Sequence, residues 1–576
     1  MVDSILCPTH QTHTESRSVF FMDNRRLFLW LSLAALVYLM WNAWALEFAP
    51  PIPKPAALPL RVHHRTPLVN PDFLKSSAEP AVVTPERSVR TSASVEVRTD
   101  LYRARIDLTG GRLASVDLLR YRKKLSAKSQ PVHWLEDQGP RRLYAVATLV
   151  TRGTSPAPGL AGLFEAPQNS FVLKKGARRL VVPLVWKHQG VTVLEQWIFH
   201  PQSYVITIQT RLVNSTRRTW QGAPLLGIDY AHPQVHSSFF DRFLPNHFIY
   251  HGAAYYDGHS YHELSPEHIQ KKKFDLEDMG GWLAYTNHYF LIALLPPRTR
   301  TWHYYAVPRT KIHYWLGALG PVESVLPGGR AIWSAGLYVG PKRQRRLATV
   351  APGLTRTVDY GFMSILSRPL YLLLAWIEHA IGNWGVAIIL LVLLIKIIFF
   401  PLQHTSGRSM ARIRAIQPRI KAIQERFKGD REQSYRATLE LYKKEKVNPV
   451  SGCLPMLLQF PIYIALYWVL LASVELRHAP FALWIQDLSA PDPLYILPVL
   501  YAGTMLVQQW VNPQAAGMDK HQRRILMVML PVMSLLFGSV MPSGLVLYWV
   551  VSGLFGIGQQ WHINRVVLRE TAKAHR

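Results

Sequence analysis

Long stretches without a charged residue constrain this chain most strongly. No Asp, Glu, Lys, Arg or His occurs within residues 447–474, 493–518 or 525–561. About 20 apolar residues in a helix cross a bilayer, so stretches of this length are typical of membrane spans. The last stretch is too long for one crossing, and Met541-Pro542-Ser543-Gly544 predicts a turn within it.

The apolar stretches together predict six spans. The first, 27–46, follows Arg25 and Arg26 and lacks a small-residue cleavage site, so we interpret it as an uncleaved anchor. Residues 1–26 are then a cytoplasmic leader, in which Met22 could serve as an alternative start that leaves 1–21 unexpressed. The other predicted spans are 380–402, 451–474, 493–511, 525–541 and 543–562.

Loop charges give the orientation of these spans. Residues 403–450 hold twelve Lys and Arg against five acids, which predicts a cytoplasmic segment. The loop 475–492 is acidic and is predicted outside, whereas Lys520, Arg523, Arg524 and the basic tail 563–576 return to the inside. Both termini are therefore predicted in the cytoplasm, with the large domain on the opposite side of the membrane.

The region between the first two spans predicts a β-rich domain. A Pro-rich tether covers 47–90, and alternating apolar residues at 191–199 and 204–213 are typical of strands. Short spacings between turn residues favour an antiparallel sandwich over 91–350. Residues 362–379 have Leu at helical spacing and predict an amphipathic helix along the outer membrane surface.

The net charge of +29 does not point to nucleic acid. Lys and Arg are spread over the whole chain, without zinc-ligand spacing or an aromatic RNA-binding motif, and DNA is not an expected partner.

Cys7 and Cys453 form neither a disulfide framework nor a metal site. No P-loop or catalytic pair occurs, and Pro266 argues against a metalloprotease helix at His262–His268, which we interpret as a surface loop. We therefore expect no enzyme, no cofactor and no metal.

Several polar residues inside the predicted spans are candidates for function. Lys396 is the one charge embedded in a span, and it either faces a wet interior or extends to the cytoplasmic interface. Gln459, Gln508 and Gln509 either bond between helices or line a groove. The segment 403–450 is helical in pattern and broken near 428–430, which predicts a basic hairpin. This cytoplasmic hairpin is either a solvated face or a docking surface for anionic lipid, ribosomal RNA or proteins.

Motifs along most of the chain resemble the YidC/Oxa/Alb family of membrane insertases, and within it the proteobacterial YidC branch. They are Gly382–Gly385, Lys446–Pro449, Gly452–Pro455, Ala479–Ile485 and Met541–Trp549, with His251–Tyr255, Gly280–Trp282 and Val358–Gly361 in the outer domain. The resemblance implies a periplasmic β-supersandwich and a five-helix core with a hydrophilic groove, open to cytoplasm and lipid. Lys396 stands where this family usually has Arg, so the charge is kept and the bidentate geometry is lost.

The resemblance also implies how the chain would work. Substrate-contacting positions would be Cys453, Leu454, Pro455, Phe460, Pro461, Tyr548 and Trp549. Partners would be nascent inner-membrane proteins, the Sec translocon, and the ribosome through the cytoplasmic hairpin and tail. A transporter or channel is the alternative, but it predicts several intramembrane charges and an internal repeat. A second alternative is a chaperone that only assists the Sec translocon, and the sequence does not distinguish it from an insertase.

Overall fold

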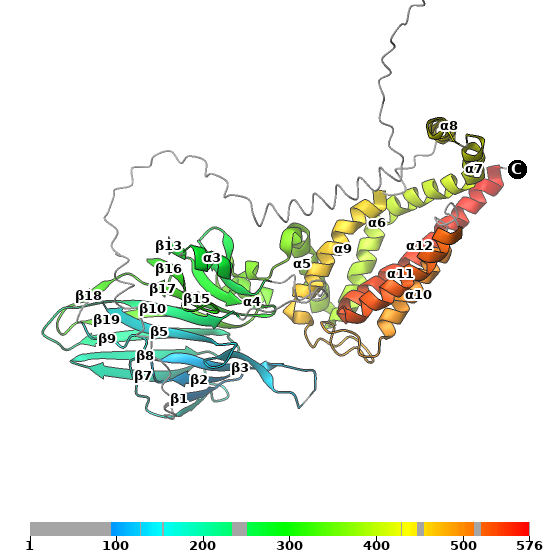
Figure 1. Ribbon diagram of the computed structural model, residues 1–576. Coiled ribbons are helices and arrows are strands. Elements are labelled where there is room, and N and C mark those ends of the chain that lie inside the picture. Colours follow the sequence, from blue (N-terminus) through cyan, green and yellow to red (C-terminus); the bar gives the residue numbers. More distant parts are fainter. Residues whose placement is uncertain are drawn as a thin grey trace, which may run out of the picture. The chain divides into compact units, whose positions relative to one another are not determined.

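The computed structural model describes residues 94–126, 128–151, 155–232, 250–272, 274–427, 429–445, 454–511 and 520–574 (Figure 1). The predicted leader, anchor and tether, together with Cys453, lie outside these residues. The described residues divide into two units. The larger lies within 67–404 and 455–565, and the smaller holds the segment 405–454 and the end of the chain from 566.

A β-rich domain occupies the N-terminal part of the larger unit. Its first ten strands are β1 (Ser94–Arg98), β2 (Tyr102–Asp107), β3 (Arg112–Arg122), β4 (Pro131–Glu136), β5 (Leu143–Thr151), β6 (Ser170–Val172), β7 (Leu180–His188), β8 (Val191–Phe199), β9 (Val205–Asn214) and β10 (Trp220–Ala231). The others are β11 (Gly252–Tyr256), β12 (Tyr261–Leu264), β13 (Phe274–Met279), β14 (Trp282–Thr286), β15 (Phe290–Leu295), β16 (Thr301–Pro308), β17 (His313–Leu319), β18 (Glu323–Val325) and β19 (Arg330–Pro341). The alternating pattern therefore predicted β8 and β9 correctly.

These strands form two sheets. The eleven-stranded sheet has the order β13-β16-β17-β10-β5-β4-β3-β2-β1-β6, with β18 beside β10. The eight-stranded sheet has the order β12-β11-β14-β15-β19-β9-β8-β7. Pairing is antiparallel except between β1 and β6. In β8 buried and half-buried residues alternate, because one face of the strand lies on the core.

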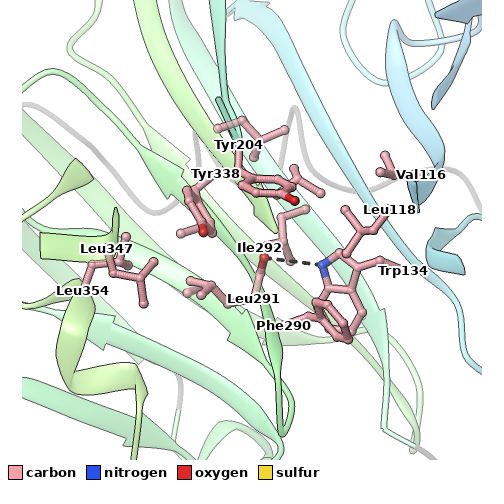
Figure 2. Packing of buried hydrophobic residues seen from close by; sticks show 14 of the residues in the cluster. Val116, Leu118, Trp134, Tyr204, Phe290, Leu291, Ile292, Tyr338, Leu347 and Leu354 are labelled. Carbon is pink, nitrogen blue, oxygen red and sulfur yellow. Dashed lines mark hydrogen bonds between the residues drawn. The ribbon is translucent and has the colours of Figure 1, made fainter. Parts of the chain in front are cut away.

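One hydrophobic core lies between the sheets. Figure 2 shows Val116, Leu118 and Trp134 of the larger sheet beside Phe290, Leu291 and Ile292 of the smaller one. The Trp134 indole N–H donates to the Leu291 carbonyl at 3.3 Å, and the Tyr102 hydroxyl donates to the Val339 carbonyl at 2.5 Å. These bonds satisfy polar groups that burial between the two sheets would otherwise leave unpaired.

The segment around His262 is not a surface loop, contrary to the sequence interpretation. His262 lies on β12, and α3 (Pro266–Lys271) begins directly after it. Pro266 takes the first helical turn, where its missing N–H costs nothing, and the Ser265 hydroxyl caps the helix by accepting from the His268 N–H. Proline here starts a helix rather than breaking one.

Short helices connect the β-rich domain to the helical part. They are α4 (Gln344–Val350), η3 (Leu354–Thr357), η4 (Gly361–Met363) and α5 (Ser364–Ile381). The predicted amphipathic helix is therefore present as α5, two residues later at each end. It buries Ser367, Tyr371 and Leu374, and it ends at Gly382, which has a left-handed conformation (φ 77°).

The apolar helices are α6 (Trp384–Ala415), α9 (Leu454–Ala472), α10 (Ile496–Val511), α11 (Lys520–Val540) and α12 (Ser543–Ala574), with η6 (Val474–Leu476) after α9. The turn predicted at 541–544 separates α11 from α12. Of the described residues, only Trp384–Ser406 is both long and apolar enough to cross a membrane, whereas Gln459–Ala472, Ile496–Val511 and Arg524–Val540 are apolar but shorter. Six spans and a five-helix core therefore stay predictions.

The predicted basic hairpin begins later than expected. α6 continues without a break through residues 403–415, and α7 (Gln417–Arg426) and α8 (Arg431–Lys444) follow it. The break falls at the predicted place, because Gly429 has a left-handed φ of 109° and the Asp430 carboxylate caps α8 by accepting from the Gln433 N–H.

Candidate functional site

A cavity of about 500 Å³ lies among the apolar helices of the larger unit. All five of these helices contribute to its wall, and none of the described residues that line it is acidic. The lining residues are Lys396 from α6, Phe460 and Tyr463 from α9, Tyr501, Met505, Gln508 and Val511 from α10, Phe537 from α11, and Trp549, Ser552, Gly553, Gly556, Ile557 and Gln560 from α12.

Lys396 is the one positively charged residue among the described residues of this lining. Its side chain points into the helix cluster and is 7% exposed, whereas the next residue, Ile397, is 62% exposed. The ammonium donates to the Tyr463 hydroxyl at 3.5 Å and lies 5.9 Å from the centre of the Tyr463 ring. Of the two orientations left open by the sequence, the structure has the inward one.

Tyr463 connects Lys396 to the opposite wall. Its hydroxyl lies 3.0 Å from the Ser552 Oγ on α12, and its ring meets the Tyr548 ring edge to face at 5.5 Å. One hydroxyl therefore accepts from the ammonium and also bonds to α12, which fixes where the charge lies in the cavity. The cavity thus has a polar side built from three helices.

Glycine residues on α12 allow α10 to pack closely against it at the cavity wall. A Cβ atom added to Gly553 would lie 2.8 Å from the Thr504 Oγ1, so only glycine allows α10 to approach this closely. Because the two helices lie this close, the Gln508 side-chain amide on α10 donates to the Gly553 carbonyl on α12 at 3.0 Å. Gly556 also faces this amide, with an added Cβ 3.4 Å from the Gln508 Nε2.

An aromatic wall closes another side of the cavity. The Trp549 ring stacks on Tyr501 at 5.1 Å and on Phe537 at 5.8 Å. The cavity therefore offers both charged and hydroxyl groups and a broad apolar surface, which suits an amphipathic polypeptide better than a small ion.

The other sequence candidates divide into three groups. Phe460, Gln508 and Trp549 line the cavity with Lys396, and Tyr548 contacts it only through Tyr463. Gln459 is buried and accepts from the Gln403 amide at 3.3 Å, while Gln509 is half-buried and its Nε2 has no partner among the described residues. Pro461 lies half-buried within α9, Leu454 and Pro455 start that helix, and Cys453 lies outside the described residues.

Glu475 and Asp492, in the loop 475–492, are internal acceptors rather than exposed charges. Glu475 accepts from the Tyr371 hydroxyl at 2.9 Å and from the Gln344 N–H at 3.3 Å, and burial raises the pKa of this carboxyl. Asp492 accepts from the Leu497 N–H at 2.7 Å and from the Trp484 indole at 2.9 Å. This cap explains why α10 begins at Ile496, after the predicted start at 493.

The β-rich domain contacts the C-terminal end of α9. The His288 Nε2 donates to the Leu471 carbonyl at 2.8 Å, and burial lowers the pKa of this imidazole to about 3, so the ring is neutral. A neutral ring with its proton on Nε2 suits this bond.

Sequence reasoning missed Tyr463, Ser552 and Gln560 in the lining. The available signal was the spacing of Ser552, Gly553 and Gly556, which places small residues on one side of α12. Within the described ranges, no group of three or more His, Cys, Asp or Glu is placed to hold a metal ion.

Comparisons with known proteins match both parts of the chain. Residues 376–570 match the 60Kd inner membrane protein family, and residues 94–373 match the YidC periplasmic domain. The membrane protein insertase YidC of Nitrosococcus oceani is 36% identical over 554 residues, covering 95% of this chain and 100% of that protein. The membrane protein insertase YidC of Thioalkalivibrio sulfidiphilus is 38% identical over 563 residues, covering 94% of this chain and 98% of that protein.

A crystal structure of an active YidC insertase with its first transmembrane domain resolved is also similar. It is 19% identical, covers 82% of this chain and 92% of its own, and has a TM-score of 0.35. The identity over nearly the full length of the relatives decides the assignment, and the chain belongs to the YidC family of membrane protein insertases.

Proposed function

We propose that this chain inserts proteins into the bacterial inner membrane and helps them fold there, using the Lys396 cavity as its working groove. The relatives are named membrane protein insertases, and the matching family is one of inner membrane proteins with a periplasmic domain. The observation that carries the proposal for the site is a charged, hydroxyl-lined cavity of about 500 Å³ among apolar helices.

In this proposal the cavity receives the polar segment of a substrate. A polar segment in the hydrocarbon core lacks hydrogen-bond partners, and this cost is the barrier to crossing. The Tyr463 and Ser552 hydroxyls and the Gln508 amide offer partners, and Lys396 offers a counter-charge to acidic residues. The barrier falls because the apolar distance that polar groups must cross becomes shorter.

The apolar segment of the substrate supplies the driving force. It would move along α9 and α12 into lipid, in contact with Phe460, Pro461 and Trp549. It would pass near Cys453, Leu454 and Pro455, and near Tyr548, which is buried behind Tyr463. Burying about 20 apolar residues in lipid favours insertion, and the membrane potential assists a translocated acidic segment. No covalent step is needed.

Topology and partners complete the proposal. We place both termini and residues 403–450 in the cytoplasm, the β-rich domain in the periplasm, and six spans in the membrane. The ribosome and anionic lipids would bind the basic cytoplasmic hairpin and tail, and the Sec translocon would share substrates. Alternating loop charges support this arrangement.

A matched pair of glycine variants tests the cavity. Gly556 lines it, whereas a Cβ atom added to Gly558 meets nothing within 4 Å. The purified chain, reconstituted in liposomes without Sec components, should insert a two-span substrate into a protease-protected form. Gly556→Phe should abolish this insertion by filling the cavity, and Gly558→Phe should retain it.

The possible outcomes test the insertion activity and the role of the cavity separately. Insertion that survives Gly556→Phe would show that the substrate does not use this cavity. Failure of the folded, correctly oriented wild-type protein to insert the substrate would instead favour a chaperone that depends on the Sec translocon.

A further inference from the structure

The β3–β4 connection projects from the β-rich domain as a basic hairpin with an apolar residue at its tip. We call the described residues 120–126 and 128–131 the outer hairpin. It carries Lys123, Lys124 and Lys128, all exposed, and no acidic residue. Leu125 lies between these lysines and is 48% exposed.

The base of the outer hairpin is rigid. Tyr121 packs edge to face on Phe290 at 5.4 Å, so the strand end is fixed on the other sheet. The Lys123 N–H donates to the Gln130 carbonyl at 2.9 Å, and the Lys124 N–H donates to the Ser129 Oγ at 2.9 Å. The lysines and Leu125 are thus presented by a hydrogen-bonded turn.

A hydrogen bond attaches the outer hairpin to the helical part. The Arg477 guanidinium donates to the Arg122 carbonyl at 2.7 Å, and Arg477 follows directly after η6 at the outer end of α9. α5 packs against α9 through the Ser367 hydroxyl, which donates to the Ala465 carbonyl at 3.1 Å. α5 leaves Ile365 and Trp376 largely exposed, as suits a helix in contact with lipid.

We propose that the outer hairpin binds the anionic phospholipid surface of the periplasmic leaflet, with Leu125 inserted among the headgroups. Clustered lysines attract anionic headgroups, and an apolar residue among them adds burial in the interface. The attachment to Arg477 keeps the tip beside the membrane. The inference rests on the proposed topology, but it is independent of how the cavity works.

Depth measurements on the full chain test this inference. A nitroxide is placed at Leu125→Cys in a background of Cys7→Ser and Cys453→Ser, with the protein in lipid nanodiscs. Leu326→Cys is the matched control, since Leu326 is 68% exposed and follows β18 at the other end of the β-rich domain (Figure 1). Collisions with oxygen and with a water-soluble nickel chelate report depth.

In nanodiscs that contain phosphatidylglycerol, nickel collisions at position 125 should be at least about threefold fewer than at position 326. The difference should vanish in pure phosphatidylcholine and in the variant with Lys123→Glu, Lys124→Glu and Lys128→Glu. The depth measurement itself needs no insertion activity. The same three glutamate changes, made in the chain that keeps Cys7 and Cys453, should leave insertion of the two-span substrate unchanged, so failure of this inference is distinguishable from failure of the proposed function.

Equal nickel access at both positions in anionic lipid would overturn the inference. So would the same immersion in both lipids, since charge would then play no part. Protection seen only in native membrane vesicles would also overturn it and would indicate a protein partner instead.

Discussion

Replacing Lys396 with Met should slow the insertion of substrates according to their charge. The substitution removes the positive charge that Lys396 brings to the cavity lining and keeps an unbranched side chain of similar length. A substrate whose polar segment carries one Asp should insert more slowly, and the same substrate with Asn at that position should be nearly unaffected.

The size of the effect follows from the dimensions of the cavity. A sphere of about 500 Å³ is about 10 Å across, so a carboxylate inside it lies about 5 to 10 Å from the Lys396 ammonium. At an effective dielectric constant of about 20, the attraction is about 2 to 3 kcal/mol. Partial desolvation of the carboxylate offsets some of this, so we expect the rate to fall at least about tenfold, which corresponds to about 1.4 kcal/mol.

The assay compares initial rates of protease-protected insertion in liposomes for the two substrates. Ile397→Ala is the control, since the neighbouring side chain points away from the cavity. Lys396→Arg keeps the charge and should retain most of the activity. Equal slowing of both substrates by Lys396→Met would refute the electrostatic reasoning and would indicate a packing defect.

Three further predictions concern single residues. Tyr463→Phe removes the hydroxyl that accepts from Lys396, and it should slow insertion of the Asp substrate about two- to fivefold; an unchanged rate would show that this hydroxyl does not position the charge. Asp492→Ala removes the cap of α10 and should cost about 1–2 kcal/mol, seen as a lower unfolding temperature in detergent, and an unchanged temperature would contradict that role. Burial lowers the pKa of Lys342 to about 7 from 10.5, so the unfolded chain binds more protons above pH 7 and stability should rise with pH from there. Lys342→Met should flatten this rise in a series of unfolding temperatures from pH 6 to 9, and parallel curves for the two proteins would contradict it.

The sequence predicted regular elements well where one face of an element is buried. β8 falls at the predicted residues because every second side chain enters the core. Element ends were less accurate, since caps depend on contacts outside the element. α10 starts late because Asp492 is held by Trp484 as well as by its own helix.

The site was only partly predictable. Lys396 was recognisable because a charge in an apolar stretch is costly, but its direction depends on how α6 packs against α9 and α12. Tyr463 and Ser552 went unnoticed, because a hydroxyl in a charge-free stretch does not show whether it faces lipid or a cavity. Local sequence patterns also did not predict that β13 pairs with β16, because β14 and β15, which lie between them in the sequence, belong to the other sheet.

The most direct test of the groove is site-specific photocrosslinking to a substrate arrested during insertion. A photoreactive residue at Gln508 would lie in the cavity, and one at Trp510 on the same helix would lie outside it, since Trp510 is 79% exposed. The proposed function predicts strong crosslinks of the polar segment from position 508 and few from position 510. Equal crosslinking from both positions, or crosslinking from position 510 alone, would contradict a path through this cavity.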